Sequence, residues 1–148
     1  MSRGWLLDTN IISELSKGTR ADAGVRAWLE RTPEEQLYLS VVTLGEIAKG
    51  IALGEARGRD MQVHRDFLDH EVPDRFGERI LPFSVEAAIV WGRLMAVLDG
   101  KRDDERRLAI DGQIAAIAQT AALDICSRNI RDFARFGIAS VLDPFTAR

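Results

Sequence analysis

Four acidic side chains in this sequence could do chemistry together: Asp8, Glu46, Asp111 and Asp132. Each follows a short apolar run typical of a buried strand, or begins the helix that leads to one. Ligands of open α/β sheets bind outside the carboxyl ends of the strands, so we expect these carboxylates to converge at one edge of a sheet. Like charges gathered there raise each other's pKa, and such a cluster is stable only with bound protons or cations.

The donor types in this cluster indicate which cation would bind. No histidine or cysteine accompanies the acids, and oxygen donors alone suit Mg²⁺ or Mn²⁺ rather than Zn²⁺. The two histidines, His64 and His70, lie six residues apart in a charged segment, and we interpret them as surface residues. The sequence contains no glycine-rich phosphate loop and no Gly-x-Ser-x-Gly nucleophile motif.

Each acid also has a structural interpretation. Thr43-x-x-Glu46 is a capping box, in which the glutamate bonds back to the helix start. Asn129-x-x-Asp132 could cap a short helix in the same way, and Asp8 could be a turn or cap residue after a strand. Asp111, close to an expected helix start, would favour the helix dipole, yet its neighbours at i+3, i+4 and i+7 are apolar or small, so it faces inward. The convergence of all four acids favours the functional interpretation.

The elements that must position these acids follow from the apolar pattern. Strands are expected at Trp5–Leu7, Leu37–Val42, Ile80–Phe83, Asp124–Ser127 and Ile138–Leu142. Helices are expected from about Ile11, at Ala21–Arg31, Thr43–Leu53, Glu55–Glu71, Val85–Leu98 and Leu108–Ala122, with a helical turn at Ile130–Arg135. Pro73–Gly77 and Gly100–Arg107 are expected connections. Strands that alternate with helices predict a three-layer α/β/α fold around a central, mainly parallel sheet.

Bulk properties limit the class of protein. A chain of 148 residues with 46% hydrophobic and 29% charged residues is expected to form one domain over residues 1–148. Its net charge of −3 argues against a basic nucleic-acid coat protein. No apolar run approaches the ~18–20 residues needed to span a bilayer. The lone cysteine, Cys126, is expected to be a buried thiol, which fits a cytoplasmic protein.

Four motifs carry a resemblance to a known family. They are Leu7–Leu15 (LDTNIISEL), Leu39–Ile47 (LSVVTLGEI), Asp111–Ala116 (DGQIAA) and Ser127–Phe133 (SRNIRDF). In this order they resemble the PIN-domain family, specifically the VapC-type toxins of bacterial toxin–antitoxin pairs. The resemblance implies a parallel sheet flanked by helices, Mg²⁺- or Mn²⁺-dependent endonuclease activity on RNA, and a homodimer held inactive by an antitoxin.

The resemblance also assigns roles to residues by position. It implies that Asp8, Asp111 and Glu46 are the metal ligands, and that the hydroxyls of Thr9 and Ser127 hold water at the metal. Gly112 stands where alanine is common.

The fourth acid is less clear from the sequence. Members of the family place it either where Asn129 stands or where Asp132 stands. We favour Asp132, with Asn129 as a polar support.

Substrate phosphates would need cations outside the acid cluster. Arg106, Arg107, Arg128 and Arg131 flank Asp111 and Asp132 in sequence and are the candidates, although any one of them could be ordinary surface charge.

Two other functions are compatible with parts of this pattern. One is a PIN fold that has lost catalysis and docks protein or RNA, which the intact acid set argues against. The other is an aspartyl-phosphate phosphatase, which needs a second aspartate at the position that Asn10 occupies.

The helix expected at Val85–Leu98 has two apolar stripes. One stripe consists of Val85, Ala88, Ile89, Gly92 and Ala96, and the other of Ala87, Trp91, Leu94 and Leu98. A helix on a sheet needs only one such stripe. We expect a homodimer that buries part of this helix, with Trp91 and Leu94 as anchors. The alternative is that neighbouring helices of the same chain cover the second stripe.

Overall fold

The computed structural model describes residues 3–98 and 102–146, and its centre is a parallel sheet. Within these residues five strands lie in the order β3-β2-β1-β4-β5. They are β1 (Trp5–Leu7), β2 (Leu37–Ser40), β3 (Ile80–Leu81), β4 (Asp124–Cys126) and β5 (Val141–Leu142). β1 is central and pairs in parallel with both β2 and β4. The chain adds β2 and β3 on one side of β1, and then β4 and β5 on the other side. The edge of the sheet beside β1 is therefore the switch point at which ligands of such sheets bind.

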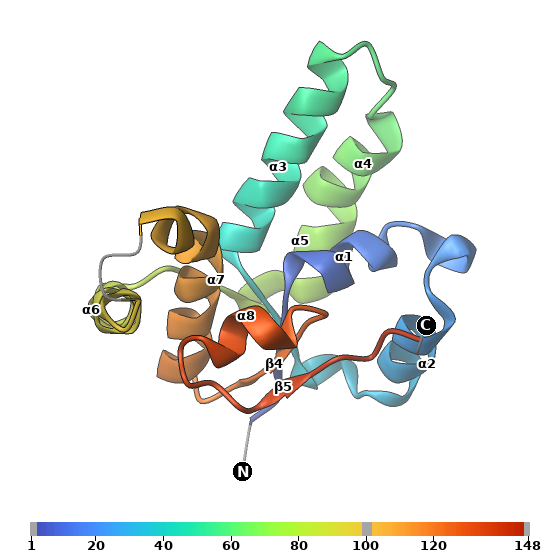
Figure 1. Ribbon diagram of the computed structural model, residues 1–148. Coiled ribbons are helices and arrows are strands. Elements are labelled where there is room, and N and C mark those ends of the chain that lie inside the picture. Colours follow the sequence, from blue (N-terminus) through green and yellow to red (C-terminus); the bar gives the residue numbers. More distant parts are fainter. Residues whose placement is uncertain (1–2, 99–101, 147–148) are drawn as a thin grey trace.

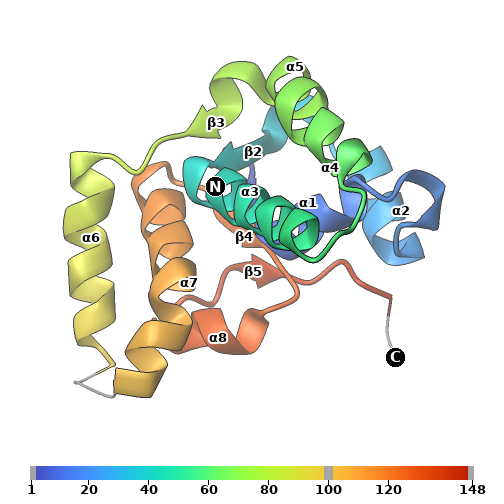
Figure 2. The ribbon, with the colours of Figure 1, turned by 90° about the horizontal axis from the view of Figure 1, so that it is seen from above.

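Helices cover both faces of this sheet. The α-helices are α1 (Thr9–Leu15), α2 (Ala23–Arg31), α3 (Val41–Ala56), α4 (Gln62–Asp66), α5 (Val72–Phe76), α6 (Val85–Ala96), α7 (Arg102–Thr120) and α8 (Ile130–Ala134). Short turns of 3-10 helix occupy Gly18–Arg20, Glu34–Gln36 and Gly77–Arg79, and a π-helical turn, η3, occupies Phe67–Glu71. Figure 1 shows α3 and α4 as an arm that projects from the body, and Figure 2 shows α6 outside α7. The expected three-layer fold with a parallel sheet is confirmed.

The alternation of side chains along β1 creates two cores. Leu7 packs with residues of α1, α2 and α5 on one face of the sheet, and Leu6 packs with residues of α6, α7 and α8 on the other. Both leucines are fully buried, as successive side chains of a strand with both faces covered must be. Cys126, on β4, lies in the first of these cores as expected.

The strand expected at Leu37–Val42 is shorter than predicted. β2 ends at Ser40, whose hydroxyl accepts a hydrogen bond from the Thr43 backbone N–H and caps α3. α3 therefore begins at Val41, two residues before the predicted start, and the β-branched pair Val41–Val42 forms its first turn. α1 likewise begins at Thr9 rather than near Ile11, because Asp8 caps it.

Two expected connections are helical. Val72–Phe76 is α5, because a proline is tolerated in the first turn of a helix; this overturns the loop expected at Pro73–Gly77. Helix α7 begins at Arg102, inside the connection expected at Gly100–Arg107, whose residues 100–101 lie outside the described residues. The acidic residues of the first turn of α7 favour the positive end of the helix dipole.

The segment expected to be one solvated helix, Glu55–Glu71, is divided. α3 continues to Ala56, a turn follows, and the chain resumes as α4 and η3. Phe67 is only 7% exposed and joins η3 to the core. His64 and His70 are exposed, as predicted.

The two stripes of α6 face opposite ways. The indole of Trp91 donates a hydrogen bond to the Ala109 carbonyl of α7, and Ala87 is fully buried. The stripe with Trp91 and Leu94 thus packs against α7 within the chain, as the alternative interpretation predicted, although both side chains are only partly buried. Val85 and Ile89, of the other stripe, remain 75% and 53% exposed.

Among the described residues, no helix is both long and apolar enough to cross a bilayer.

Candidate active site

Asp8 lies at the centre of the site, directly after β1. Its side chain is almost fully buried, and its Oδ2 accepts hydrogen bonds from the Ser127 hydroxyl at 2.6 Å and the Asn10 amide at 3.3 Å. Oδ1 accepts from the backbone N–H of Thr9 at 2.8 Å, so Asp8 is also the N-cap of α1. Burial raises the pKa of Asp8, the charge of Glu46 raises it further, and these hydrogen bonds oppose the rise. The capping interpretation of Asp8 is therefore correct, and it does not exclude a ligand role.

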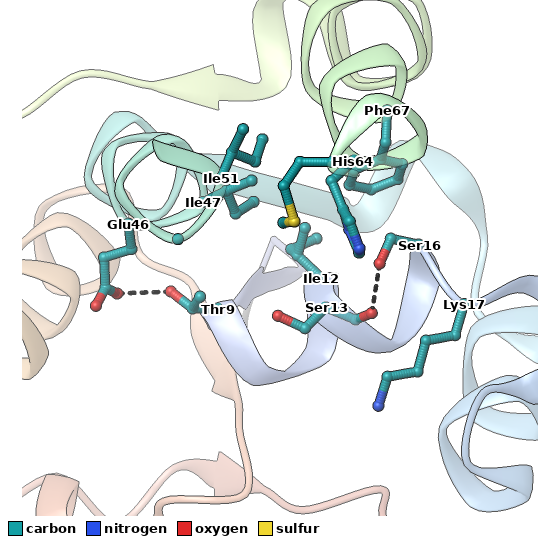
Figure 3. Close-up of a pocket in the computed structure, with 12 residues that line it drawn as sticks. Thr9, Ile12, Ser13, Ser16, Lys17, Glu46, Ile47, Ile51, His64 and Phe67 are labelled. Atoms are coloured by element: carbon teal, nitrogen blue, oxygen red, sulfur yellow. Dashed lines mark hydrogen bonds between the residues drawn. The ribbon is translucent and has the colours of Figure 1, made fainter. Parts of the chain in front are cut away.

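Glu46 enters the site from the second turn of α3. Its Oε1 accepts a hydrogen bond of 2.6 Å from the hydroxyl of Thr9 (Figure 3). Since Ser40 caps α3, the capping-box interpretation of Glu46 is wrong. The hydroxyls of Thr9 and Ser127 both donate to carboxylates, so in this structure they fix the acids in place.

Asp111 lies in the interior of α7, half-buried, rather than near the helix start that the sequence suggested. Its inward neighbours Ile114, Ala115 and Ala118 are buried, as expected. Burial raises the pKa of Asp111 to about 7, and the charges of Asp8, Asp132 and Glu46 contribute in the same direction. All four predicted acids therefore interact electrostatically around Asp111.

Asp132, in the first turn of α8, forms an ion pair with an arginine of α7. Its Oδ1 accepts a hydrogen bond of 2.8 Å from Arg107 Nη1. The side chain of Asn129 makes no capping hydrogen bond, and its backbone N–H donates to the Ser127 hydroxyl. The charge of Asp132 thus raises the pKa of Asp111. The backbone N–H of Asn129, by contrast, contacts the Ser127 hydroxyl that donates to Asp8.

The four candidate arginines differ in their surroundings. Arg107 forms ion pairs with Asp132, at 2.8 Å, and with Asp104, at 3.6 Å. The guanidinium of Arg128 lies 4.5 Å from the centre of the Phe145 ring. Arg106 and Arg131 are exposed, with no ion pair to another described residue.

Asn10 is the site residue whose role sequence reasoning missed. Its amide donates to Asp8 and to the Ser127 hydroxyl at 3.2 Å, and its carbonyl oxygen accepts from the backbone N–H of Arg128. Asn10 thereby joins the ends of β1 and β4. The only sequence signal was a polar residue two positions after Asp8, because its other two partners, Ser127 and Arg128, lie more than 110 residues away.

The donor set fits a hard divalent cation. Asp8 and Asp111 offer carboxylate oxygens, and Glu46 lies close enough to affect the pKa of both. Within residues 3–98 and 102–146, no three acidic, histidine or cysteine side chains form a preassembled cation site. Magnesium is held by one or two carboxylates together with waters and substrate phosphates, so a pair of aspartates with a third acid nearby meets its requirements.

A groove of about 270 Å³ opens beside Thr9 and Glu46, between α1, α3 and the α4–η3 segment (Figure 3). Its apolar wall consists of Ile12, Ile47, Ile51, Met61 and Phe67. Ser13, Ser16, Lys17 and His64 form its polar rim. Thr9 and Glu46, joined by their hydrogen bond, line one end of the groove (Figure 3).

Comparison with known proteins identifies the family. The PIN domain model matches residues 5–139. The VapC ribonuclease Y4jK of Sinorhizobium fredii is 33% identical, over 95% of this chain and 96% of that protein. Toxin FitB of Neisseria gonorrhoeae is 32% identical, over 95% of this chain and 97% of that protein. A toxin–antitoxin complex from Klebsiella pneumoniae contains a chain with a TM-score of 0.63 and 26% identity, over 97% of this chain and 100% of that one. A family model that spans most of the chain, together with relatives above 30% identity, shows that this protein belongs to the PIN-domain family, alongside VapC ribonucleases and the FitB toxin.

Proposed function

We propose that this chain is a Mg²⁺- or Mn²⁺-dependent endoribonuclease, the toxin of a toxin–antitoxin pair. The observation that carries the proposal is the Asp111 carboxyl: burial raises its pKa to about 7, and the charges of Asp8, Asp132 and Glu46 act in the same direction. Such an arrangement destabilises the folded protein at neutral pH unless a cation binds. The names of the relatives, a VapC ribonuclease and a toxin, favour RNA as the substrate.

The mechanism follows from what each side chain can do. Asp8, oriented by Ser127 and Asn10, and Asp111 would hold the cation, with Glu46 completing the set. When bound, the cation supplies a water of lowered pKa and offsets charge on the phosphate. The Glu46 carboxylate, positioned by Thr9, accepts a hydrogen bond from the attacking water and so orients it.

The experiment that tests the proposal is incubation of the purified protein with total RNA, with and without Mg²⁺, followed by mapping of new 5′ ends. We expect new ends only when Mg²⁺ or Mn²⁺ is present, and loss of these ends with EDTA. RNA that is bound but uncut in the presence of either cation would instead indicate a non-catalytic binding module.

The partner of this toxin would be an antitoxin protein. We propose that an apolar segment of the antitoxin binds in the groove between α1, α3 and α4. A segment bound there would lie beside Glu46 and block access of RNA to the acid cluster. The structural neighbour described as a toxin–antitoxin complex favours a partner of this kind.

Asp132 is expected to be the fourth acid of the site. Asp132→Ala should weaken Mn²⁺ binding by about tenfold, since its charge acts on Asp111, whereas Asn129→Ala should weaken it less. Titration of Mn²⁺ by calorimetry compares the two variants. A larger loss in Asn129→Ala would assign the fourth position to the asparagine, and no loss in either would leave a three-acid site.

The exposed stripe of α6 is expected to form a homodimer. Val85 and Ile89, one helical turn apart, would supply its apolar centre. We expect the wild type to be a dimer in light scattering at micromolar concentration and Ile89→Arg to shift it to monomer. Val63→Arg, at an exposed valine on α4, is the control that should stay dimeric. A monomeric wild type would refute this interface.

A further inference from the structure

A second cleft, of about 310 Å³, lies between α3 and α7 beside the acid cluster. Its lining residues are Val42, Gly45, Glu46, Lys49, Ile110 and Gln113. The α3 residues are spaced i, i+3, i+4 and i+7, which places them on one face of the helix. The α7 residues come directly before and two positions after Asp111 in the sequence. Glu46, whose charge acts on Asp8 and Asp111, also lines the cleft, so the cleft adjoins the proposed site of RNA cleavage.

Two of the three polar side chains of this cleft are available to a ligand, whereas the third, Glu46, accepts a hydrogen bond from Thr9. Among the described residues, the side chains of Lys49 and Gln113 form no hydrogen bond or ion pair. A glutamine amide carries both donors and an acceptor, the combination that matches the edge of a nucleobase. A lysine ammonium suits a phosphate. Between them, the half-buried Val42 and Ile110 offer apolar walls to the faces of a base.

Gly45 leaves space for a ligand to lie against α3 in the cleft. A glycine within a helix is less stable than alanine, so its presence needs a reason. Packing does not supply one, because a Cβ at Gly45 would meet nothing within 4 Å, and its φ is not positive. The missing side chain leaves the helix backbone open to close approach from the cleft.

We propose that this cleft binds a nucleobase of single-stranded RNA next to the scissile phosphate. Gln113 reads the edge of the base, Lys49 contacts the adjoining phosphate, and Gly45 lets the base lie against α3. RNA recognition by proteins commonly uses bases splayed out of a single strand in this way. The inference rests on the proposed ribonuclease function and adds the residues that select the cleavage site.

The test compares variants on a random-sequence single-stranded RNA pool with mapped 5′ ends. Gln113→Leu should lose about tenfold in preference at one nucleotide position, while Gln119→Leu, on an exposed face of the same helix, should cut like the wild type. Gly45→Ala should have a higher Tm but cut about tenfold more slowly. Mn²⁺ binding should be unchanged in all three, which separates base recognition from damage to the acid cluster.

The outcomes separate this inference from the proposed function. A wild type that cuts the pool, with unchanged cleavage sites in Gln113→Leu and undiminished activity in Gly45→Ala, would overturn the base cleft and leave the ribonuclease intact. A wild type that cuts no RNA with Mg²⁺ or Mn²⁺ would overturn the proposed function and this inference together.

Discussion

Asp111→Asn is expected to lower the rate of RNA cleavage by about 10³-fold or more, because a ligand that places the cation contributes several kcal/mol to the transition state. Asparagine keeps the size of the side chain and a neutral oxygen, but it removes the charge that binds the cation. Initial rates on a single-stranded RNA with saturating Mg²⁺ measure the effect. Asp8→Asn should lose activity to a similar degree, and because asparagine also caps helices well, α1 should remain folded.

Asp103→Asn is the matched control for this prediction. Asp103 lies in the first turn of the same helix and is exposed, so the same chemical change is made outside the acid cluster. Its cleavage rate should stay within about twofold of the wild type, the range of ordinary surface substitutions. Full activity in Asp111→Asn, with an unchanged melting temperature, would remove Asp111 from the list of ligands.

The sheet and the acids at its edge could be predicted from the sequence because both depend on local patterns. Trp5–Leu7 is an apolar run that ends at Asp8, and it is β1 with the same bounds. Strands rich in apolar residues and separated by helices leave few arrangements other than a covered parallel sheet. Asp8 and Ser127 then meet at the carboxyl edge because β1 and β4 are neighbours in that sheet.

Helix boundaries in charged segments were predicted less well. Residues 102–107 are strongly charged and have no apolar periodicity, so they resembled a connection. In the helix that they form, Asp104 interacts with Arg107 one turn later and with Arg135 of the loop after α8, at 3.6 and 2.8 Å. The first contact is a local pattern, whereas the second joins segments that the sequence does not relate.

Side-chain partnerships within the site could not be predicted at all. Arg107 was a candidate for substrate phosphate, and the structure pairs it with Asp132, 25 residues away. Asn10 connects Asp8 to Ser127 and Arg128 across more than 110 residues. Such contacts depend on how α7 packs on α8 and on how α1 packs against the end of β4, and a pattern of residue types in one sequence does not determine this packing.

The stability of the metal-free protein is expected to fall as the pH rises from 5 to 8. Asp111 has a pKa of about 7 in the folded protein and about 3.8 in the unfolded chain. Between these values the folded state binds a proton that the unfolded state does not, so the stabilisation is complete below the lower pKa and is lost as the pH passes the higher one. Burial raises the pKa of Asp8 as well, which acts in the same direction. The carboxyls whose pKa is lowered, those of Glu14, Asp22, Glu34 and Asp104, lose their contribution only at more acidic pH.

Asp111→Asn isolates the contribution of this carboxyl. Because Asp111 is only half-buried, solvent screens part of the effect, and we expect the wild type to lose about 1 to 2 kcal/mol relative to the variant between pH 5 and 8. This corresponds to a difference of about 4 °C in Tm, measured by circular dichroism in EDTA at both pH values. Adding Mg²⁺ should raise the Tm of the wild type more at pH 8 than at pH 5, since protons compete with the cation for the same carboxylates. A wild type and variant with parallel Tm curves in EDTA would show that Asp111 is ionised throughout this range and that the four acids do not crowd one another.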